Sequence, residues 1–302
     1  MASFRKHLPS ILRWLGTLLT LGLLIWLLGS QGWENIFAAF RQIAWWRLAL
    51  ALAATVLSRL AVATRWFALL RGARVKAPFG LVTRITFAGL FASNFLPTTI
   101  GGDVIRLGGA VRFGFSRAIS LASLMVDRLV GMAGMAMALP GLLALVGKFP
   151  GSFFFWPLAS VSSTAMPRWD ALRSGVRRIS DVLARWIKNP GSLLAALACT
   201  WVHMVCTFVA VDLILAGMGQ SVSFWLIAGL WSLVYFVTLL PISVNGMGTQ
   251  ELAISLLFTR LGGVSAEGAL VMALLMRVFP MLASLPGAVF VPGMIAGNPE
   301  TD

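Results

Sequence analysis

Residues 94–106 read N-F-L-P-T-T-I-G-G-D-V-I-R and interrupt an apolar segment that begins at Phe87. Proline and paired glycines break a helix, and the residues after the break turn basic at Arg106 and Arg112. Arg84 precedes the segment, so the positive-inside rule puts both ends on the cytoplasmic side. A segment that enters and leaves on one side is a re-entrant hairpin, which is tolerated only where it is buried in protein or lines a wet cavity. The stretch therefore predicts a functional site.

A second break follows the apolar run 223–240, where residues 239–251 read L-L-P-I-S-V-N-G-M-G-T-Q-E. Its flanks are nearly neutral, which predicts a hairpin that enters from the external side. Each break is followed by an arginine within the next span, Arg128 or Arg277. The same order of features in two halves that enter from opposite sides predicts an inverted repeat, a plan that many transporters use. Two unrelated proline kinks are the alternative.

The composition of the whole chain fits a membrane protein. Of 302 residues, 59% are hydrophobic and 11% are charged, whereas a soluble domain has about 25% charged residues. Several apolar runs approach or exceed the roughly 20 residues that a helix needs to cross the hydrocarbon core. We therefore predict an all-α fold, a polytopic transmembrane helix bundle with two re-entrant hairpins, in a single integral membrane domain over residues 1–302. The repeat halves are predicted at about 47–147 and 190–297.

The formal net charge of +14 indicates an anionic partner. Because the basic residues gather at helix ends and short loops, membrane lipids, anionic ones in particular, are the expected partner and nucleic acid is not. The same rule places the N-terminus, with Arg5 and Lys6, and the polar tail 297–302 in the cytoplasm. The very basic segment 168–188 has apolar residues at helical spacing and predicts an amphipathic helix on the cytoplasmic leaflet. A solvated connector is the alternative there.

The acids and arginines near the breaks are expected to pair, because ionised side chains are costly inside a bilayer. Asp103 and Arg106 share a helix face, and Asp103 lies in a first turn, where the helix dipole favours an anion. Across segments we predict a pair of Asp103 with Arg128 and, by symmetry, a pair of Glu251 with Arg277. A purely structural cap and ion pair is the alternative to a binding role.

The same residues predict a phosphate site. Guanidinium groups and helix N-termini both suit phosphate oxygens, so Arg128 and Arg277, with the amides at the glycines of each break, are predicted to hold a lipid phosphate. Asp127 points about 100° away from its neighbour Arg128 and needs a partner on another segment. Asp103 and Glu251 would contact a cationic headgroup or take up a proton. The predicted substrate-binding set is Thr98, Thr99, Gly101, Gly102, Asp103, Arg106, Asp127, Arg128, Ser243, Asn245, Gly246, Gly248, Glu251 and Arg277.

Other chemistry is not indicated by the sequence. Cys199, His203 and Cys206 lie on one helix face but lack a fourth ligand, so we predict no metal site and expect His203 to form a hydrogen bond between helices. We find no phosphate-binding P-loop, dinucleotide fingerprint or G-x-S-x-G motif in a suitable context. We therefore predict no catalytic residues, no cofactor and no enzymatic activity.

Three ordered motifs, at residues 94–106, at 123–131 (S-L-M-V-D-R-L-V-G) and at 241–251, resemble the lysylphosphatidylglycerol synthase transmembrane-region family. The resemblance spans roughly residues 10–295. It implies a flippase-like membrane domain in a bacterial cytoplasmic membrane, similar to the lipid-translocating half of the multiple peptide resistance factor. Because that factor's aminoacyl-transfer domain has no counterpart in residues 1–302, we expect translocation rather than lipid synthesis.

Taken with the broken segments, the resemblance favours a lipid translocase for a phosphate-bearing or isoprenoid-type lipid. Two other classes stay open: a membrane-embedded accessory subunit or enzyme of lipid headgroup modification, and an ion-coupled transporter of small solutes, because broken helices also bind ions. A second copy of the chain and a separate lipid-modifying enzyme are the protein partners that stay open.

Overall fold

The structure, a computed structural model, describes residues 32–95, 101–145, 189–240 and 246–295, together with Trp186, Ser243 and a few isolated positions between 18 and 29. Every regular element in these ranges is helical, which confirms the predicted all-α class. The predicted first span, the C-terminal tail and, apart from Trp186, the predicted helix at 168–188 lie outside the described residues.

Four helices are long and apolar enough to cross a membrane: α3 (Trp45–Gly72), α6 (Arg117–Ala138), α8 (Pro190–Gly217) and α11 (Ala266–Ser284). The 28 residues of α3 or of α8 measure about 42 Å, which exceeds the roughly 30 Å of a hydrocarbon core. Short helices continue two of them, η1 (Leu139–Leu145) after α6, and η4 (Leu285–Val289) with α12 (Val291–Ile295) after α11. These spans support an integral membrane protein, as the sequence predicts.

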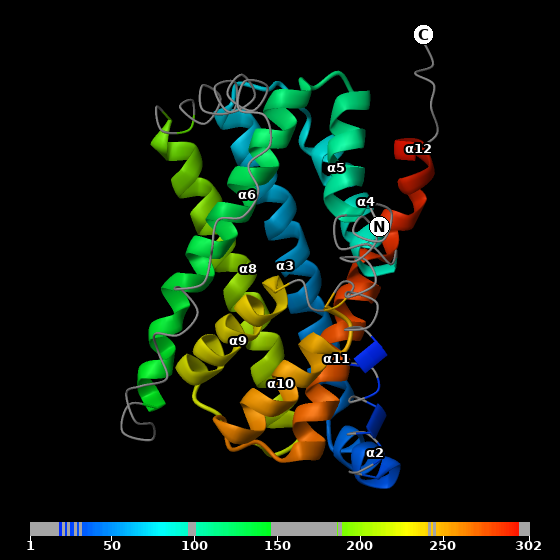
Figure 1. The fold of residues 1–302 in the computed structure, drawn as a ribbon, viewed down its shortest axis with the longest axis vertical. Helices are drawn as coiled ribbons and strands as arrows, with labels where there is room; N and C mark the ends of the chain where they lie inside the picture. The colour runs from blue at the N-terminus through cyan, green and yellow to red at the C-terminus, as the bar shows by residue number, and fades with distance from the viewer. Residues whose placement is uncertain are drawn as a thin grey trace, which may run out of the picture.

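The core lies where α8 packs against its neighbours. α3 and α8 run side by side through the bundle (Figure 1). Buried side chains of α8, among them Met204 and Phe208, join the largest apolar cluster together with residues of the later helices. On the outside, large apolar side chains such as Leu129 and Val202 stay exposed, as expected for helices that face lipid.

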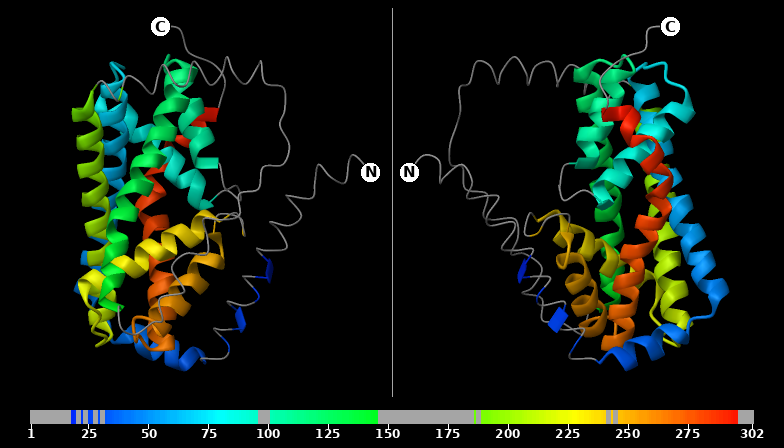
Figure 2. Two further views of the ribbon diagram at one scale, coloured as in Figure 1. Left: turned by 60° about the vertical axis from the view of Figure 1, so that its left-hand side comes forward. Right: turned by 90° about the vertical axis from the view of Figure 1, so that its right-hand side faces the viewer.

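Two pairs of shorter helices pack against this frame. The first pair is α4 (Phe79–Phe95) with α5 (Gly101–Arg112), and the second is α9 (Phe224–Leu239) with α10 (Thr249–Arg260). The 12 residues of α5 or of α10 measure about 18 Å, too short to cross a bilayer. Figures 1 and 2 show the first pair in one half of the bundle and the second pair in the other half. This arrangement fits the two predicted hairpins, but their position in a bilayer and the inverted repeat stay predictions.

Close contact between α4 and α5 depends on a pair of glycines. A Cβ atom on Gly102 would lie 2.6 Å from the carbonyl oxygen of Gly89 and closer still to the Oγ of Ser93. The two backbones can therefore approach only because these positions lack side chains. The approach fixes the start of α5 against the middle of the bundle.

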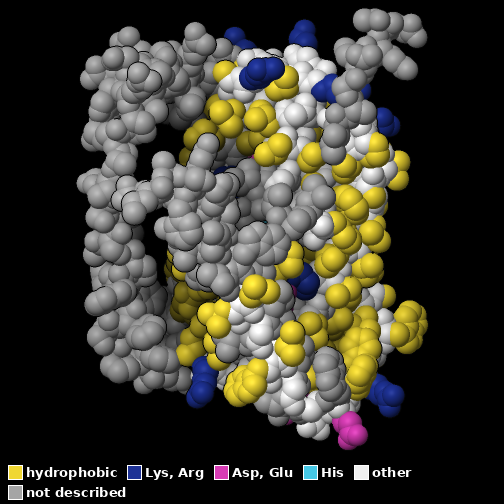
Figure 3. Space-filling view, turned by 45° about the vertical axis from the view of Figure 1, so that its right-hand side comes forward, with side chains coloured by type: hydrophobic (Ala, Val, Ile, Leu, Met, Phe, Trp, Pro, Cys, Tyr) yellow, Lys and Arg dark blue, Asp and Glu magenta, His cyan; other side chains and the backbone are white. Residues whose placement is uncertain are grey.

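The two ends of the bundle differ in charge. At one end, the connections from α3 to α4 and from α5 to α6 carry basic residues and no acid among the positions that the structure describes: Arg71, Arg74, Lys76, Arg112 and Arg117. At the other end, where α2 (Trp33–Arg41) packs on α11, both signs occur: Glu34, Arg41, Arg260 and Glu267. Figure 3 shows dark blue side chains at both ends and magenta ones at the lower end only. This difference agrees with the positive-inside rule, and the cytoplasmic side itself stays a prediction.

Candidate functional site

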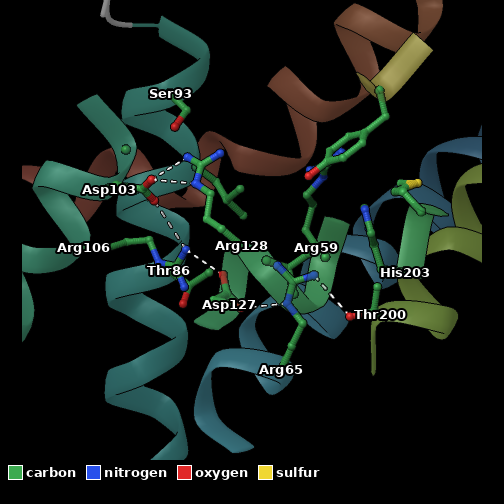
Figure 4. A pocket seen from close by; sticks show the side chains of 17 residues that line it. Arg59, Arg65, Thr86, Ser93, Asp103, Arg106, Asp127, Arg128, Thr200 and His203 are labelled. Carbon is green, nitrogen blue, oxygen red and sulfur yellow. Dashed lines mark hydrogen bonds and ion pairs between the residues drawn. The ribbon is translucent and has the colours of Figure 1, made fainter. Parts of the chain in front are cut away.

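A cavity of about 200 Å³ lies between α3, α4, α5, α6, α8 and α9. Figure 4 shows polar side chains from several helices that converge on it. Its charged residues come from α3, α5 and α6, all in the first predicted half: Arg59, Arg65, Asp103, Arg106, Asp127 and Arg128. The cavity therefore gathers six charged residues inside a bundle of largely apolar helices.

The cavity lies close to the middle of the long helices. Arg59 is about 21 Å from the start of α3, Arg128 about 17 Å from the start of α6, and His203 about 20 Å from the start of α8. These depths correspond to the hydrocarbon core of a bilayer that the helices cross. Ionised side chains at that depth are functional candidates because they are costly to place there.

A buried network centred on Asp127 forms one wall. Arg65 donates from Nε to Oδ1 of Asp127 at 2.7 Å, and Arg106 donates from Nη1 to Oδ2 at 3.2 Å. Arg65 also donates to the hydroxyl of Thr200 in α8 at 3.3 Å. The guanidinium of Arg106 lies over the ring of Trp66, 4.4 Å from its centroid. Asp127 thus finds its partners on other helices, as its position next to Arg128 predicts.

A second, more exposed pair lies beside this network. Arg128 donates from Nε at 3.0 Å and from Nη2 at 2.5 Å to the same oxygen of Asp103. The side chain of Arg128 is 55% exposed and that of Asp103 is 26% exposed. This is the cross-segment pair that the sequence predicts, and Asp103 lies in the first turn of α5, as predicted.

Arg106 connects the two groups. Its Nη1 lies 3.7 Å from Oδ1 of Asp103 and 3.2 Å from Oδ2 of Asp127. One guanidinium therefore stands between two carboxylates, so a change in the pairing of Asp103 alters the electrostatic environment of Asp127.

Arg59 has a different environment from the other three arginines of the cavity. No carboxylate pairs with it among the residues that the structure describes, and its Nε is buried without a hydrogen-bond acceptor there. His203, which also lines the cavity, is hydrogen-bonded through Nδ1 to the Oγ of Ser58 in α3 at 2.6 Å. The predicted interhelical hydrogen bond of His203 is confirmed.

The second predicted half-site lies apart from the cavity. Arg277 in α11 donates from Nε to Oε1 of Glu251 at 2.5 Å and from Nη2 to the carbonyl of Gly246 at 3.1 Å. The predicted pair is present, and Glu251 lies in the first turn of α10. Neither residue lines the cavity, so among the described residues the structure does not gather Glu251 and Arg277 with Asp103 and Arg128 in the one shared pocket that we expected. The physical reason is that Arg277 turns to the α9–α10 connection next to its own helix.

The remaining predicted residues fall into three groups. Gly102 lines the cavity, and Gly101 begins α5 beside it. Gly246 and Gly248 have φ of +66° and +75° and shape the turn into α10, while Ser243 is hydrogen-bonded to the hydroxyl of Thr249 at 2.7 Å, away from the cavity. Thr98, Thr99 and Asn245 lie outside the described residues.

A family model described as "Lysylphosphatidylglycerol synthase TM region" matches residues 13–287. The chain belongs to this family. No curated protein matches it. The match confirms the resemblance carried by the three sequence motifs and, with the four long apolar helices, supports an integral membrane protein.

In this lysylphosphatidylglycerol synthase transmembrane-region protein, sequence reasoning missed Arg59 and Arg65. Both lie in the span-length apolar helix α3, and an arginine inside a span is a candidate functional residue by itself. That signal was available from the sequence. The contributions of Thr200 and Tyr235 had no such signal, because hydroxyl groups are common in transmembrane helices and only the packing brings them to the cavity.

Proposed function

We propose that this protein is a lipid translocase that moves a phosphate-bearing lipid between the leaflets of its membrane. The observation that carries the proposal is the mid-bundle cavity, in which four guanidinium groups meet two carboxylates. Such a cavity suits an anion, because guanidinium groups bind phosphate oxygens through two parallel hydrogen bonds. The family's description, which names a lipid synthase, agrees with a lipid substrate.

The size of the cavity supports a lipid headgroup as the ligand. A cavity of about 200 Å³ is large enough for several water molecules. That space accepts a phosphate with a few neighbouring atoms but not the hydrocarbon chains, which would stay in the surrounding bilayer. Translocation by this route would shield only the headgroup from hydrocarbon.

Arg128 is the residue that would first take the phosphate. It is the most exposed member of the two ion-pair groups, while Asp127 and its partners are buried. A phosphate that binds Arg128 displaces Asp103, and Arg106 stands 3.7 Å from that carboxylate, ready to pair with it. After this exchange Asp103 and Asp127 would each still have an arginine partner. A carboxylate without a counter-charge is costly where the dielectric constant is low.

Transport in proteoliposomes tests this proposal. Wild-type protein should speed the appearance of a labelled phospholipid in the opposite leaflet, and Arg128→Ala should slow it about tenfold or more, as expected when a charge-assisted contact is lost. Arg71→Ala, at the basic end of α3 and outside the cavity, is the matched control. A folded Arg128→Ala protein that transports at the wild-type rate would refute the proposal. Ion flux without lipid movement would favour the ion-coupled class instead.

A further inference from the structure

The charges that line the cavity do not balance. Arg59, Arg65, Arg106 and Arg128 supply four positive charges, and Asp103 and Asp127 supply two negative ones, so these six residues carry a formal charge of +2. An uncompensated charge is unfavourable at this depth in a membrane. A ligand that carries two negative charges would remove the excess.

The excess can be assigned to particular groups. Asp103 compensates Arg128, and Asp127 is shared between Arg65 and Arg106. Arg59 has no acidic partner in the described part of the chain. One positive charge therefore remains on Arg59 and the other on the shared Arg65–Arg106 pair.

Hydrogen-bond donors without an acceptor lie on Arg59 and on Arg106, where the excess charge also lies. The Nε of Arg59 and both Nε and Nη2 of Arg106 are buried and have no acceptor among the described residues. Arg106 is only 8% exposed, so its free donors are enclosed in protein. Buried donors usually have partners, and those that lack one in a cavity wall indicate a group that is still to bind.

We propose that the cavity selects a lipid phosphomonoester and that Arg59 is the residue that sets this preference. A phosphomonoester carries about −1.5 to −2 charges at neutral pH, which matches the excess of +2. A phosphodiester headgroup such as that of phosphatidylglycerol carries one negative charge, and a zwitterionic headgroup carries none overall. This inference rests on the proposed function and narrows its substrate class.

The position of Arg59 allows it to act on the ligand without holding the fold together. It lies near the middle of α3 and lines the cavity with His203 (Figure 4). Arg65, in the same helix, is fixed by Asp127 and Thr200 instead. Removing the charge of Arg59 therefore breaks no ion pair in the described structure, so Arg59→Gln should fold at least as well as the wild type.

Lipid retention measured by native mass spectrometry tests the preference. The purified full-length protein is mixed with equal amounts of phosphatidic acid, phosphatidylglycerol and phosphatidylcholine. Wild-type protein should retain phosphatidic acid about tenfold more than phosphatidylglycerol, and phosphatidylcholine least. Arg59→Gln should lose the preference for phosphatidic acid, and Arg59→Lys, which keeps the charge, should retain most of it. Arg47→Gln removes the same charge from the other end of the same helix, away from the basic connections, and should behave as wild type.

Several results would overturn this inference. Equal retention of phosphatidic acid and phosphatidylglycerol by the wild type would contradict the charge matching, and an unchanged preference in folded Arg59→Gln would contradict the role of Arg59. Soluble glycerol 3-phosphate that displaces phosphatidic acid at equal concentration would contradict a lipid as the source of the phosphomonoester.

Lipid retention and translocation in proteoliposomes, measured side by side, separate this inference from the proposed function. Selective retention of phosphatidic acid with no translocation in proteoliposomes would support the inference and contradict the translocase. Equally fast translocation of phosphatidylcholine and phosphatidic acid would contradict the inference and leave the translocase standing.

Discussion

Asp127 in α6 accepts a hydrogen bond at 2.7 Å from Arg65 in α3, which precedes it by 62 residues. The other oxygen of Asp127 accepts from Arg106, so one buried carboxylate joins three helices. Each of these charges would be costly in the hydrocarbon core without the others. The network therefore holds one wall of the cavity together, while the pair of Asp103 and Arg128 beside it is more exposed.

Removal of the shared carboxylate should destabilise the protein strongly. Asp127→Asn leaves Arg65 and Arg106 buried without a counter-charge, and we expect the free energy of unfolding to fall by about 3–5 kcal/mol. Thermal unfolding of the detergent-solubilised protein measures the change. Glu34→Gln, an exposed acid in α2, is the control and should shift stability by less than about 0.5 kcal/mol. An Asp127→Asn protein as stable as the wild type would contradict the structural role of the network.

The pair of Asp103 and Arg128 should matter more for transport than for stability. Because the Arg128 side chain is more than half exposed, we expect a coupling energy of no more than about 1 kcal/mol in a double-mutant cycle with Asp103→Asn and Arg128→Gln. Transport by Arg128→Gln should nevertheless be strongly reduced. A coupling of several kcal/mol together with normal transport would mean that the pair only stabilises the fold.

In the second half, the pair of Glu251 and Arg277 should behave as a buried structural pair. Glu251 is 4% exposed, so Arg277→Met leaves a buried carboxylate and should lower the free energy of unfolding by about 3 kcal/mol. Replacing both residues, Glu251→Gln with Arg277→Met, should recover much of that loss. If the double variant is less stable than either single variant, the two residues do not act as a pair.

The contact between α4 and α5 gives a test of the packing. Gly102→Ala places a methyl group against the backbone of α4 and should cost about 1–3 kcal/mol of stability. Gly108→Ala, in the same helix, meets no atom within 4 Å and should instead stabilise by up to about 1 kcal/mol. Equal effects of the two substitutions on the melting temperature would show that the helices are not in close contact.

The sequence predicts the helical class and both cross-segment ion pairs for a simple reason. Charged residues are rare in membrane spans, so each acid near a break has few candidate partners. Asp103 and Glu251 each follow a break and therefore lie in the first turn of a helix, where the dipole favours them. These local rules select Arg128 and Arg277 without knowledge of the packing.

The composition of the cavity could not be predicted in the same way. Symmetry of the two breaks suggests one shared pocket, but Arg277 pairs with Glu251 and Gly246 beside its own helix. The cavity takes its remaining polar groups from α3, α4, α8 and α9. The contacts of Arg65 with Asp127 and Thr200 depend on how α3, α6 and α8 pack together. Helix packing in a membrane is set by small residues and side-chain fit, which spacing along the sequence does not report.

The initial rate of transbilayer movement of a phosphate-bearing lipid tests the central claim most directly. Liposomes that contain wild-type protein should move the labelled lipid faster than protein-free liposomes, and liposomes with folded Arg128→Ala should move it about tenfold more slowly than wild type. Wild-type liposomes that move the lipid no faster than protein-free ones would contradict the account.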